Sequence, residues 1–422
     1  MIPLDKQNLL SRIAVDLTPV LPAGDNGGAK VFAIALIKQL ASMTPKTQWI
    51  LLTQSLSHQE ISATMQQHAN ILCQQALTSS QKRALPKFAK FMLRLQRIPY
   101  ARLFITYCYY FLCDLLKLKQ TKDTLKTLNA DLLFCPFTAP TFSRRNLPTV
   151  CVVHDIQFKT YPHFFDETSF FYRSYTFKRA CKKSRALIAI SDYTHQSILR
   201  YYKHQQQKVM TIHTNIIPPL TKKRFDDQRV LKELGLTSQK YLLYPSNFWK
   251  HKNHEMLLSA FQMLIRKNAL QDSLKLVLTG APDARQQWLQ HSTKQMGLAE
   301  HIVFPGYLPN EQLQQIMQHA AGVIFPSLYE GFGLPVIEAM AAGVPVACSN
   351  CTAMPEIAGN AALLFNPTTP HNICQALQTL LFDKTQRTLL IQRGVARAAE
   401  FANTTEMAKR YWDTFVLAKE GL

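Results

Sequence analysis

A repeating order of elements most constrains the fold of this chain: a short apolar run, a turn, and then apolar residues at helical spacing. Continuous short apolar runs are typical of strands that are buried on both faces. Strands that alternate with helices form βαβ units, and these units build parallel sheets. The length of 422 residues suits two such domains, at roughly 100–200 residues per domain.

In the first half, five apolar runs predict strands and three amphipathic segments predict helices. The expected strands are Arg12–Leu17, Trp49–Thr53, Asp131–Phe134, Thr149–Val153 and Ala186–Ile190. The expected helices are Ala29–Leu40, Glu167–Cys181 and Tyr193–Tyr201, the last with Ser191 as its N-cap. Pro218 and Pro219 can continue neither a helix nor a central strand, so Asn215–Leu220 is the expected linker.

The same pattern begins again after this linker. Strands are expected at Tyr241–Tyr244, Leu274–Thr279, Ile302–Phe304, Gly322–Phe325, Pro345–Ala347 and Ala362–Phe365. Helices are expected at Asn253–Arg266, Ala284–Met296, Asn310–His319, Leu334–Ala342, His371–Leu381, Arg387–Phe401 and Thr405–Ala418. We therefore predict two parallel α/β domains, 1–218 and 219–404, that face a cleft, with ligands at the carboxyl ends of the strands.

The positive charge of the chain is concentrated in its first half. The formal net charge is +21, and residues 1–219 hold 28 Lys and Arg against 11 Asp and Glu. Nucleic acid, anionic lipid and a phosphorylated substrate all suit such a charge. Segment 82–126 combines 11 basic residues with the aromatic-rich run Leu103–Leu112, which favours a helix on an anionic membrane surface. The alternative is that the apolar run packs into the protein core while the Lys and Arg side chains of the segment face solvent.

Other sequence features favour a cytoplasmic protein at the inner face of the membrane. Charged residues interrupt Met1–Val20, so no signal peptide is expected, and no run of about 20 apolar residues is present. The nine cysteines are scattered and odd in number, which is typical of reduced thiols. Cys348 and Cys351 have no second ligand pair that would complete a zinc site. No nucleic-acid-binding motif accompanies the basic segment, so no nucleic-acid partner is expected.

One loop in the second half has the pattern of an anion site. A predicted strand ends at Phe325, a loop with Glu330, Gly331 and Gly333 follows, and a helix begins near Leu334. The glycines let backbone N–H groups approach a ligand, and the helix N-terminus adds partial positive charge. A diphosphate fits such a site. Glu338, eight residues after Glu330, is placed to accept hydrogen bonds from ribose hydroxyls.

A lysine follows the first strand of the second domain. The segment Tyr244–His254 leads from this strand into the next helix and contains Lys252. The carboxyl ends of parallel strands meet at one edge, so we expect Lys252 near Gly331. A lysine there can neutralise a leaving diphosphate.

These residues resemble the family 4 retaining glycosyltransferases of GT-B fold, the bacterial glycosyl group 1 transferases. The resemblance is strong over about 240–370 and loose over the first half. It implies two Rossmann-like domains and, we expect, a C-terminal helix 405–422 that returns to the first domain. It implies that Glu338 holds the ribose, Glu330 contacts the donor sugar and Lys252 contacts the diphosphate. The donor site is expected to include Tyr307, Gly331, Phe332, Gly333 and Leu334. Family members often have Arg where this chain has His251.

The first domain has two weaker matches to the same family. The loop Gly24–Gly28 resembles the Gly-rich loop that approaches the donor phosphates, with Gly27 and Gly28 as donor-binding candidates. An ordinary strand–helix turn is the alternative. His154 ends the strand Thr149–Val153, where the family often has a His that faces the donor sugar. The predicted catalytic residues are His154, Lys252 and Glu330.

The predicted activity is transfer of a hexose, with mannose as one candidate, from a nucleotide diphosphate sugar. The expected acceptor is a saccharide, or a lipid-linked saccharide of lipopolysaccharide or polysaccharide synthesis. Retention of configuration is implied by the resemblance alone. No Asp-x-Asp motif stands in a suitable loop, so neither a metal nor a cofactor is expected. A sugar phosphorylase or a nucleotide-sugar epimerase on the same architecture, and a non-catalytic nucleic-acid-binding protein, are the alternatives.

Overall fold

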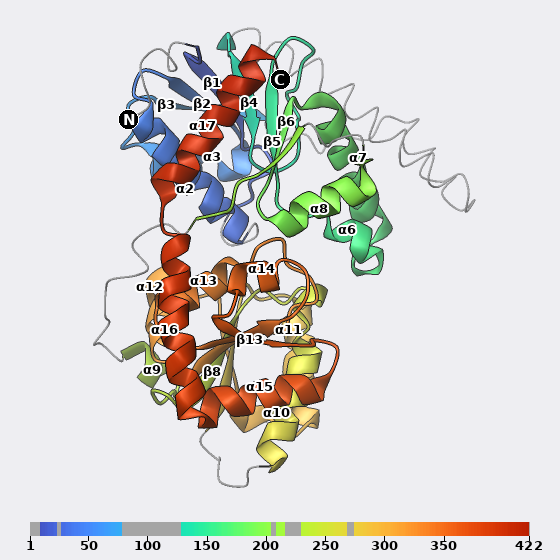
Figure 1. Cartoon of the computed structure of the whole chain (residues 1–422), viewed down its shortest axis with the longest axis vertical. Helices are drawn as coiled ribbons and strands as arrows, with labels where there is room; N and C mark the ends of the chain where they lie inside the picture. Colours follow the sequence, from blue (N-terminus) through green and yellow to red (C-terminus); the bar gives the residue numbers. More distant parts are fainter. Residues whose placement is uncertain are drawn as a thin grey trace, which may run out of the picture. The chain divides into compact units, whose positions relative to one another are not determined.

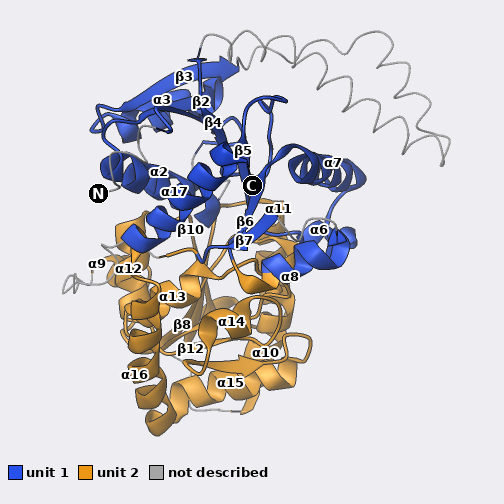
Figure 2. Cartoon of the chain, turned by 45° about the horizontal axis from the view of Figure 1, so that its top comes forward, with its two compact units in different colours: residues 1–190, 194–213, 405–422 blue, residues 191–193, 214–404 orange. Residues whose placement is uncertain are grey.

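The computed structural model describes residues 9–22, 27–77, 128–203, 208–215, 229–267 and 274–421. The basic segment 82–126 and residues 24–26 of the Gly-rich loop lie outside the described residues. The chain divides into two compact units, which are coloured separately in Figure 2. Unit 1 comprises residues 1–190, 194–213 and 405–422, and unit 2 comprises residues 191–193 and 214–404.

Unit 1 is built on a parallel sheet that has seven strands within the described residues, in the order β3-β2-β1-β4-β5-β6-β7. The strands are β1 (Arg12–Asp16), β2 (Gln48–Gln54), β3 (Ile71–Leu77), β4 (Leu132–Cys135), β5 (Thr149–Val153), β6 (Ala186–Ala189) and β7 (Val209–Thr211). Strands β4, β5 and β6 are buried along their whole length, as the continuous apolar runs predict.

Helices connect these strands and cover the sheet (Figure 1). They are α2 (Gly28–Met43), α3 (Ser55–Met65), α6 (Gln157–Thr160), α7 (Glu167–Lys183) and α8 (Asp192–Tyr201), with a 3-10 turn at Pro162–Phe164. Helix α7 shows why such segments form helices. The Asp166 carboxylate accepts from the N–H of Ser169 at its start, and Lys182 and Lys183 lie in its last turn, where they suit the helix dipole.

The last helix, α17 (Thr404–Glu420), packs on unit 1 through aromatic side chains. The ring of Trp412 lies 6.5 Å from that of Trp49 on β2, and the ring of Phe415 lies 4.9 Å from that of Phe134 on β4. Both tryptophans are fully buried. The predicted return of the C-terminal helix to the first domain is therefore confirmed.

Unit 2 repeats the architecture with a parallel sheet of six strands among the described residues, in the order β10-β9-β8-β11-β12-β13. The strands are β8 (Tyr241–Pro245), β9 (Lys275–Thr279), β10 (Ile302–Gly306), β11 (Gly322–Phe325), β12 (Val346–Ser349) and β13 (Ala362–Phe365). The α-helices are α9 (Arg229–Glu233), α10 (His254–Lys267), α11 (Ala284–Gln295), α12 (Asn310–Gln318), α13 (Leu334–Ala341), α14 (Met354–Ala358), α15 (Pro370–Phe382) and α16 (Lys384–Glu400). Two 3-10 turns, Lys250–Lys252 and Ala299–His301, complete the unit.

The predicted α/β class with two parallel sheets is confirmed, and each predicted strand has a counterpart within two residues at either end. The strands that the sequence did not predict, β3 and β7, lie at the two edges of the unit 1 sheet. β3 is only partly buried and contains two glutamines, and β7 has three residues, so neither has a continuous apolar run. Among the described helices, none is long and apolar enough to cross a membrane.

The docking of α17 can be tested with a matched pair of variants on that helix. Trp412→Ala removes a fully buried side chain against Trp49, so we expect unit 1 to lose about 3–5 kcal/mol of unfolding free energy. Leu417→Ala deletes a side chain that is 44% exposed, and should change stability by less than about 0.5 kcal/mol. Urea unfolding measures both, and equal losses would show that α17 does not dock through Trp412.

Candidate functional site

The order of strands in unit 2 singles out one place at the edge of the sheet. Sequence order reverses between the adjacent strands β8 and β11, so the chain leaves these two strands toward opposite sides. Ligands of open parallel sheets bind outside the carboxyl ends of the strands at such a switch point. Lys252 follows β8 and Glu330 follows β11. The predicted pair therefore lies where the topology places a site.

The side chains of Lys252 and Glu330 form an ion pair at this point. Lys252 Nζ lies 2.7 Å from Glu330 Oε1, and the two side chains are only 14% and 13% exposed. Burial alone would raise the pKa of Glu330, but the positive charges of Lys252 and His251 outweigh burial and lower it. Glu330 is therefore an anion at neutral pH, held against an ammonium that suits a phosphate.

Asn253, which directly follows Lys252, has a structural role. It adopts the left-handed conformation, with φ of 61°, which Asn tolerates better than most residues. Its buried side-chain N–H groups donate to the carbonyl oxygens of Pro326, at 3.0 Å, and Pro367, at 2.8 Å. The hydroxyl of Tyr244 donates to the Lys252 carbonyl oxygen at 2.9 Å. Asn253 thus joins the loops that follow β8, β11 and β13, and it fixes the residue beside it.

The loop after Glu330 leads into the N-terminus of α13. Gly333 is the N-cap, with φ of 114°, and a Cβ there would lie 2.9 Å from Met354 Sδ, so this position requires glycine. Within the described residues, the N–H groups of Gly333 and Leu334 have no hydrogen-bond acceptor. These donors and the helix dipole together suit an anion. The side chain of Phe332 is buried edge-on against Phe401, so its ring is not exposed to a ligand.

Glu338 lies in the second turn of α13 and has a different environment from Glu330. Its side chain is half-buried, and no cation or hydrogen-bond donor contacts its carboxylate among the described residues. Burial raises the pKa of Glu338 to about 7. A partly buried carboxyl without a protein partner is typical of a group that binds a ligand, because desolvation is otherwise uncompensated.

Tyr307 follows β10, at the same edge of the sheet, and is 56% exposed. Near it, Gly280 directly follows β9, and its N–H donates to the carbonyl oxygen of Gly306. A Cβ on Gly280 would lie 2.6 Å from the Ser246 carbonyl oxygen, so the loops after β8 and β9 meet at the backbone. This close approach brings the carboxyl-end loops of three strands together.

In unit 1, His154 follows β5, and its ring is partly buried beside Phe32 and Phe137. His154 Nε2 lies 2.7 Å from the carbonyl oxygen of Pro136. A carbonyl oxygen can only accept, so Nε2 carries the proton and Nδ1 keeps a lone pair. Burial lowers the pKa of His154, which keeps the ring neutral. Gly27 is the N-cap of α2, with φ of 54°, and Gly28 begins the helix.

Comparison with known proteins gives the family. Residues 226–397 match the family described as glycosyl transferases group 1, and residues 26–217 match the one described as glycosyltransferase family 4. The two matches cover both units and most of the chain. The chain belongs to glycosyltransferase family 4.

Several relatives of this glycosyltransferase are mannosyltransferases by name. It is 29% identical over 261 residues to O-antigen chain mannosyltransferase B of Escherichia coli, covering 60% of this chain and 66% of the relative. It is 26% identical over 272 residues to the serotype-specific mannosyltransferase WbdA of the same species, covering 62% of this chain and 33% of the relative. The match thus spans less than two thirds of each relative.

Solved structures confirm the GT-B fold. WaaG, a glycosyltransferase involved in lipopolysaccharide biosynthesis, is 16% identical and aligns with a TM-score of 0.69 over 96% of this chain and 99% of its own. Anabaena HepE, in complex with UDP and glucose, is 15% identical, with a TM-score of 0.68 over 96% and 99%. At such identity the likeness concerns the fold alone.

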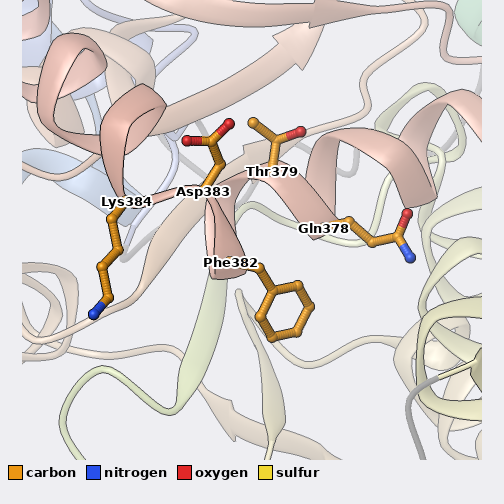
Figure 3. A pocket seen from close by; sticks show the side chains of 5 residues that line it. All are labelled: Gln378, Thr379, Phe382, Asp383 and Lys384. Carbon is orange, nitrogen blue, oxygen red and sulfur yellow. The ribbon is translucent and has the colours of Figure 1, made fainter.

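Unit 2 of the glycosyltransferase also has a surface depression, and Figure 3 shows the side chains that line it. It is lined by Gln378, Thr379, Phe382, Asp383 and Lys384, where α15 meets α16. Arg387, in the first turn of α16, donates to the carbonyl oxygen of Ala321, directly before β11. The junction therefore lies at the amino ends of the strands, opposite the edge that holds Lys252 and Glu330.

Two residues near the site were not predicted from the sequence. Thr352, after β12, accepts a hydrogen bond from the Glu330 N–H at 3.0 Å, and Cys351 contacts the carbonyl oxygens of the same loop. Both stand more than twenty residues from Glu330 in the chain. These contacts form because β12 pairs with β11, so no pattern of neighbouring residues in the sequence could have predicted them.

The raised pKa of Glu338 predicts a pH-dependent stability that Glu338→Gln removes. Between pH 4.5, its ordinary pKa, and about 7, the folded protein binds more protons at Glu338 than the unfolded chain does. Stability that depends on this carboxyl is therefore present at low pH and lost as pH rises through about 7. The Tm of Glu338→Gln minus that of the wild type should rise from pH 4.5 to 7 and then level off. A constant difference across this range would contradict the raised pKa.

Proposed function

We propose that this glycosyltransferase moves a hexosyl residue from a nucleotide diphosphate sugar to a saccharide acceptor, with retention of configuration. The observation that carries the proposal is the arrangement at the switch point of unit 2. The segment that follows β11 contains Glu330, the N-terminus of α13 and the unpartnered carboxyl of Glu338. Lys252, from the loop after the neighbouring strand β8, forms an ion pair with Glu330. Each group matches one part of such a donor.

In the proposed complex, the diphosphate oxygens accept hydrogen bonds from the N–H groups of Gly333 and Leu334, and the ammonium of Lys252 pairs with their negative charge. The ribose hydroxyls bond to Glu338, and the sugar lies at Glu330. Lys252 and the helix N-terminus stabilise the negative charge that grows on the diphosphate as it leaves. We propose that these groups serve without a metal ion or a cofactor.

The proposed reaction is a single displacement on one face of the sugar. The acceptor hydroxyl forms a bond to C1 while the bond from C1 to the diphosphate oxygen breaks. The hydroxyl proton passes to a phosphate oxygen of the leaving group, so no covalent sugar–enzyme intermediate forms. His154 stays a predicted sugar contact: it lies at the carboxyl end of β5, and its Nδ1 is free of a proton to accept from a hydroxyl.

The relatives suggest the substrates. Two O-antigen chain mannosyltransferases and a serotype-specific mannosyltransferase are among them, which favours a mannosyl donor such as GDP-mannose and a growing polysaccharide or lipopolysaccharide acceptor. A lipid-linked acceptor agrees with the basic first half of the chain, where Lys and Arg outnumber Asp and Glu by 28 to 11 over residues 1–219. We therefore propose a cytoplasmic enzyme at the inner face of the membrane.

The donor site is tested by two substitutions and one control. Lys252→Ala removes the cation at the leaving group, and kcat should fall by about 100-fold or more. Glu338→Ala removes an acceptor of ribose hydroxyls, and the affinity for GDP or UDP should fall about 10- to 100-fold. Lys384→Ala, at the opposite edge of the sheet, should leave both unchanged. Transfer from GDP-mannose and calorimetric binding of GDP and UDP give these values for folded variants. Normal turnover by Lys252→Ala would refute the assignment.

Membrane association is tested with vesicles. The full chain should bind vesicles that contain phosphatidylglycerol, and binding should fall at least tenfold between 50 and about 300 mM salt, because Lys and Arg charges are screened. Vesicles of phosphatidylcholine alone are the control and should bind weakly. Binding that does not change with salt, or no binding to either kind of vesicle, would refute membrane association and leave the donor-site proposal unchanged.

A further inference from the structure

The turn that follows β12 lies against the loop that carries Glu330. Cys351 Sγ lies 3.4 Å from the carbonyl oxygen of Leu328, within hydrogen-bond distance for a thiol. Thr352 Oγ1 accepts from the N–H of Glu330 at 3.0 Å, and the N–H of Ala353 donates to the carbonyl oxygen of Glu330 at 3.4 Å. Three consecutive residues of one turn thus hold Leu328 and both backbone polar groups of Glu330.

Thr352 adopts a backbone conformation that its residue type disfavours. Its φ is 58°, in the left-handed region, where a β-branched side chain is a rare exception. Such strain persists only where the surrounding structure requires it, and it is concentrated at functional sites. At Thr352 the conformation coincides with the hydrogen bond from the Glu330 N–H. Glycine would relieve the strain but would supply no hydroxyl.

We propose that Thr352 is a positioning residue for sugar transfer, which acts by fixing the backbone of Glu330 through its hydroxyl. The inference rests on the proposed function, in which Glu330 contacts the donor sugar. Lys252 fixes the Glu330 carboxylate from β8, and Thr352 fixes the backbone of the same residue from β12. Glu330 is thereby held at both its carboxylate and its backbone, and a displacement of about 1 Å at a reacting group can cost about 100-fold in rate.

Three substitutions separate the hydroxyl from the strain. Thr352→Ala and Thr352→Gly both lack the hydroxyl, but only alanine is strained at this φ. Both variants should lower kcat for transfer from GDP-mannose about 10- to 100-fold, although the glycine variant should have a Tm at least as high as the alanine variant. Thr352→Ser keeps the hydroxyl and should keep kcat within about twofold of the wild type.

Two further measurements distinguish positioning from a general loss of structure. GDP and UDP contain no transferred sugar, so their dissociation constants should not increase in Thr352→Ala. In a double-mutant cycle with Glu330→Gln, the added effect of Thr352→Ala on kcat should shrink to less than about twofold, because the group that Thr352 positions is already changed.

The outcomes are decisive. If the wild type transfers sugar and Thr352→Ala or Thr352→Gly has wild-type kcat, the positioning role is wrong and the proposed function stands. Additive effects in the double-mutant cycle, or a slow Thr352→Ser, also overturn the role of the hydroxyl. If the wild type transfers no sugar from any nucleotide sugar while it still binds GDP or UDP, the proposed function fails, and this inference fails with it.

Discussion

The ion pair between Lys252 and Glu330 is the interaction on which the rest of the site depends. Both side chains are largely removed from water, and this costs free energy that each charge recovers only from the other and from nearby dipoles. The pair is therefore stable only if its two loops are held in register. The reversal of sequence order between β8 and β11 makes this possible, because it brings the two loops to one point of the sheet.

Hydrogen bonds to backbone groups join the loops around this pair. The Asn253 side chain donates hydrogen bonds to the carbonyl oxygens of Pro326 and Pro367, and the Thr352 hydroxyl accepts one from the N–H of Glu330. Gly280 allows the loops after β8 and β9 to touch. The two consecutive residues Lys252 and Asn253 therefore have different roles. The lysine supplies the charge that pairs with Glu330, and the asparagine fixes the loop that places the lysine.

These contacts show what the sequence could and could not predict. Buried central strands such as β5 and β11 are continuous apolar runs, so their positions follow from the residues alone. The partly exposed β3 lacks that signal, although it pairs with β2 along its whole length. In the site, Glu330 and Glu338 were recognisable because they share one strand–loop–helix segment. Thr352 was not, because its partner comes from a different βα unit, and the burial of Phe332 against Phe401 depends on the distant α16.

The two glutamates of this segment differ in protonation although they stand eight residues apart. Burial acts on both, but Lys252 and His251 keep the pKa of Glu330 low, whereas no cation faces Glu338 among the described residues and its pKa rises to about 7. Glu330 is thus a fixed charge that can stabilise a cationic sugar centre. Glu338 is more readily protonated than Glu330, and a protonated carboxyl can both donate to and accept from hydroxyl groups. A vicinal diol offers donors and acceptors together, so the protonated carboxyl would suit such a group without the cost of keeping a second charge out of water.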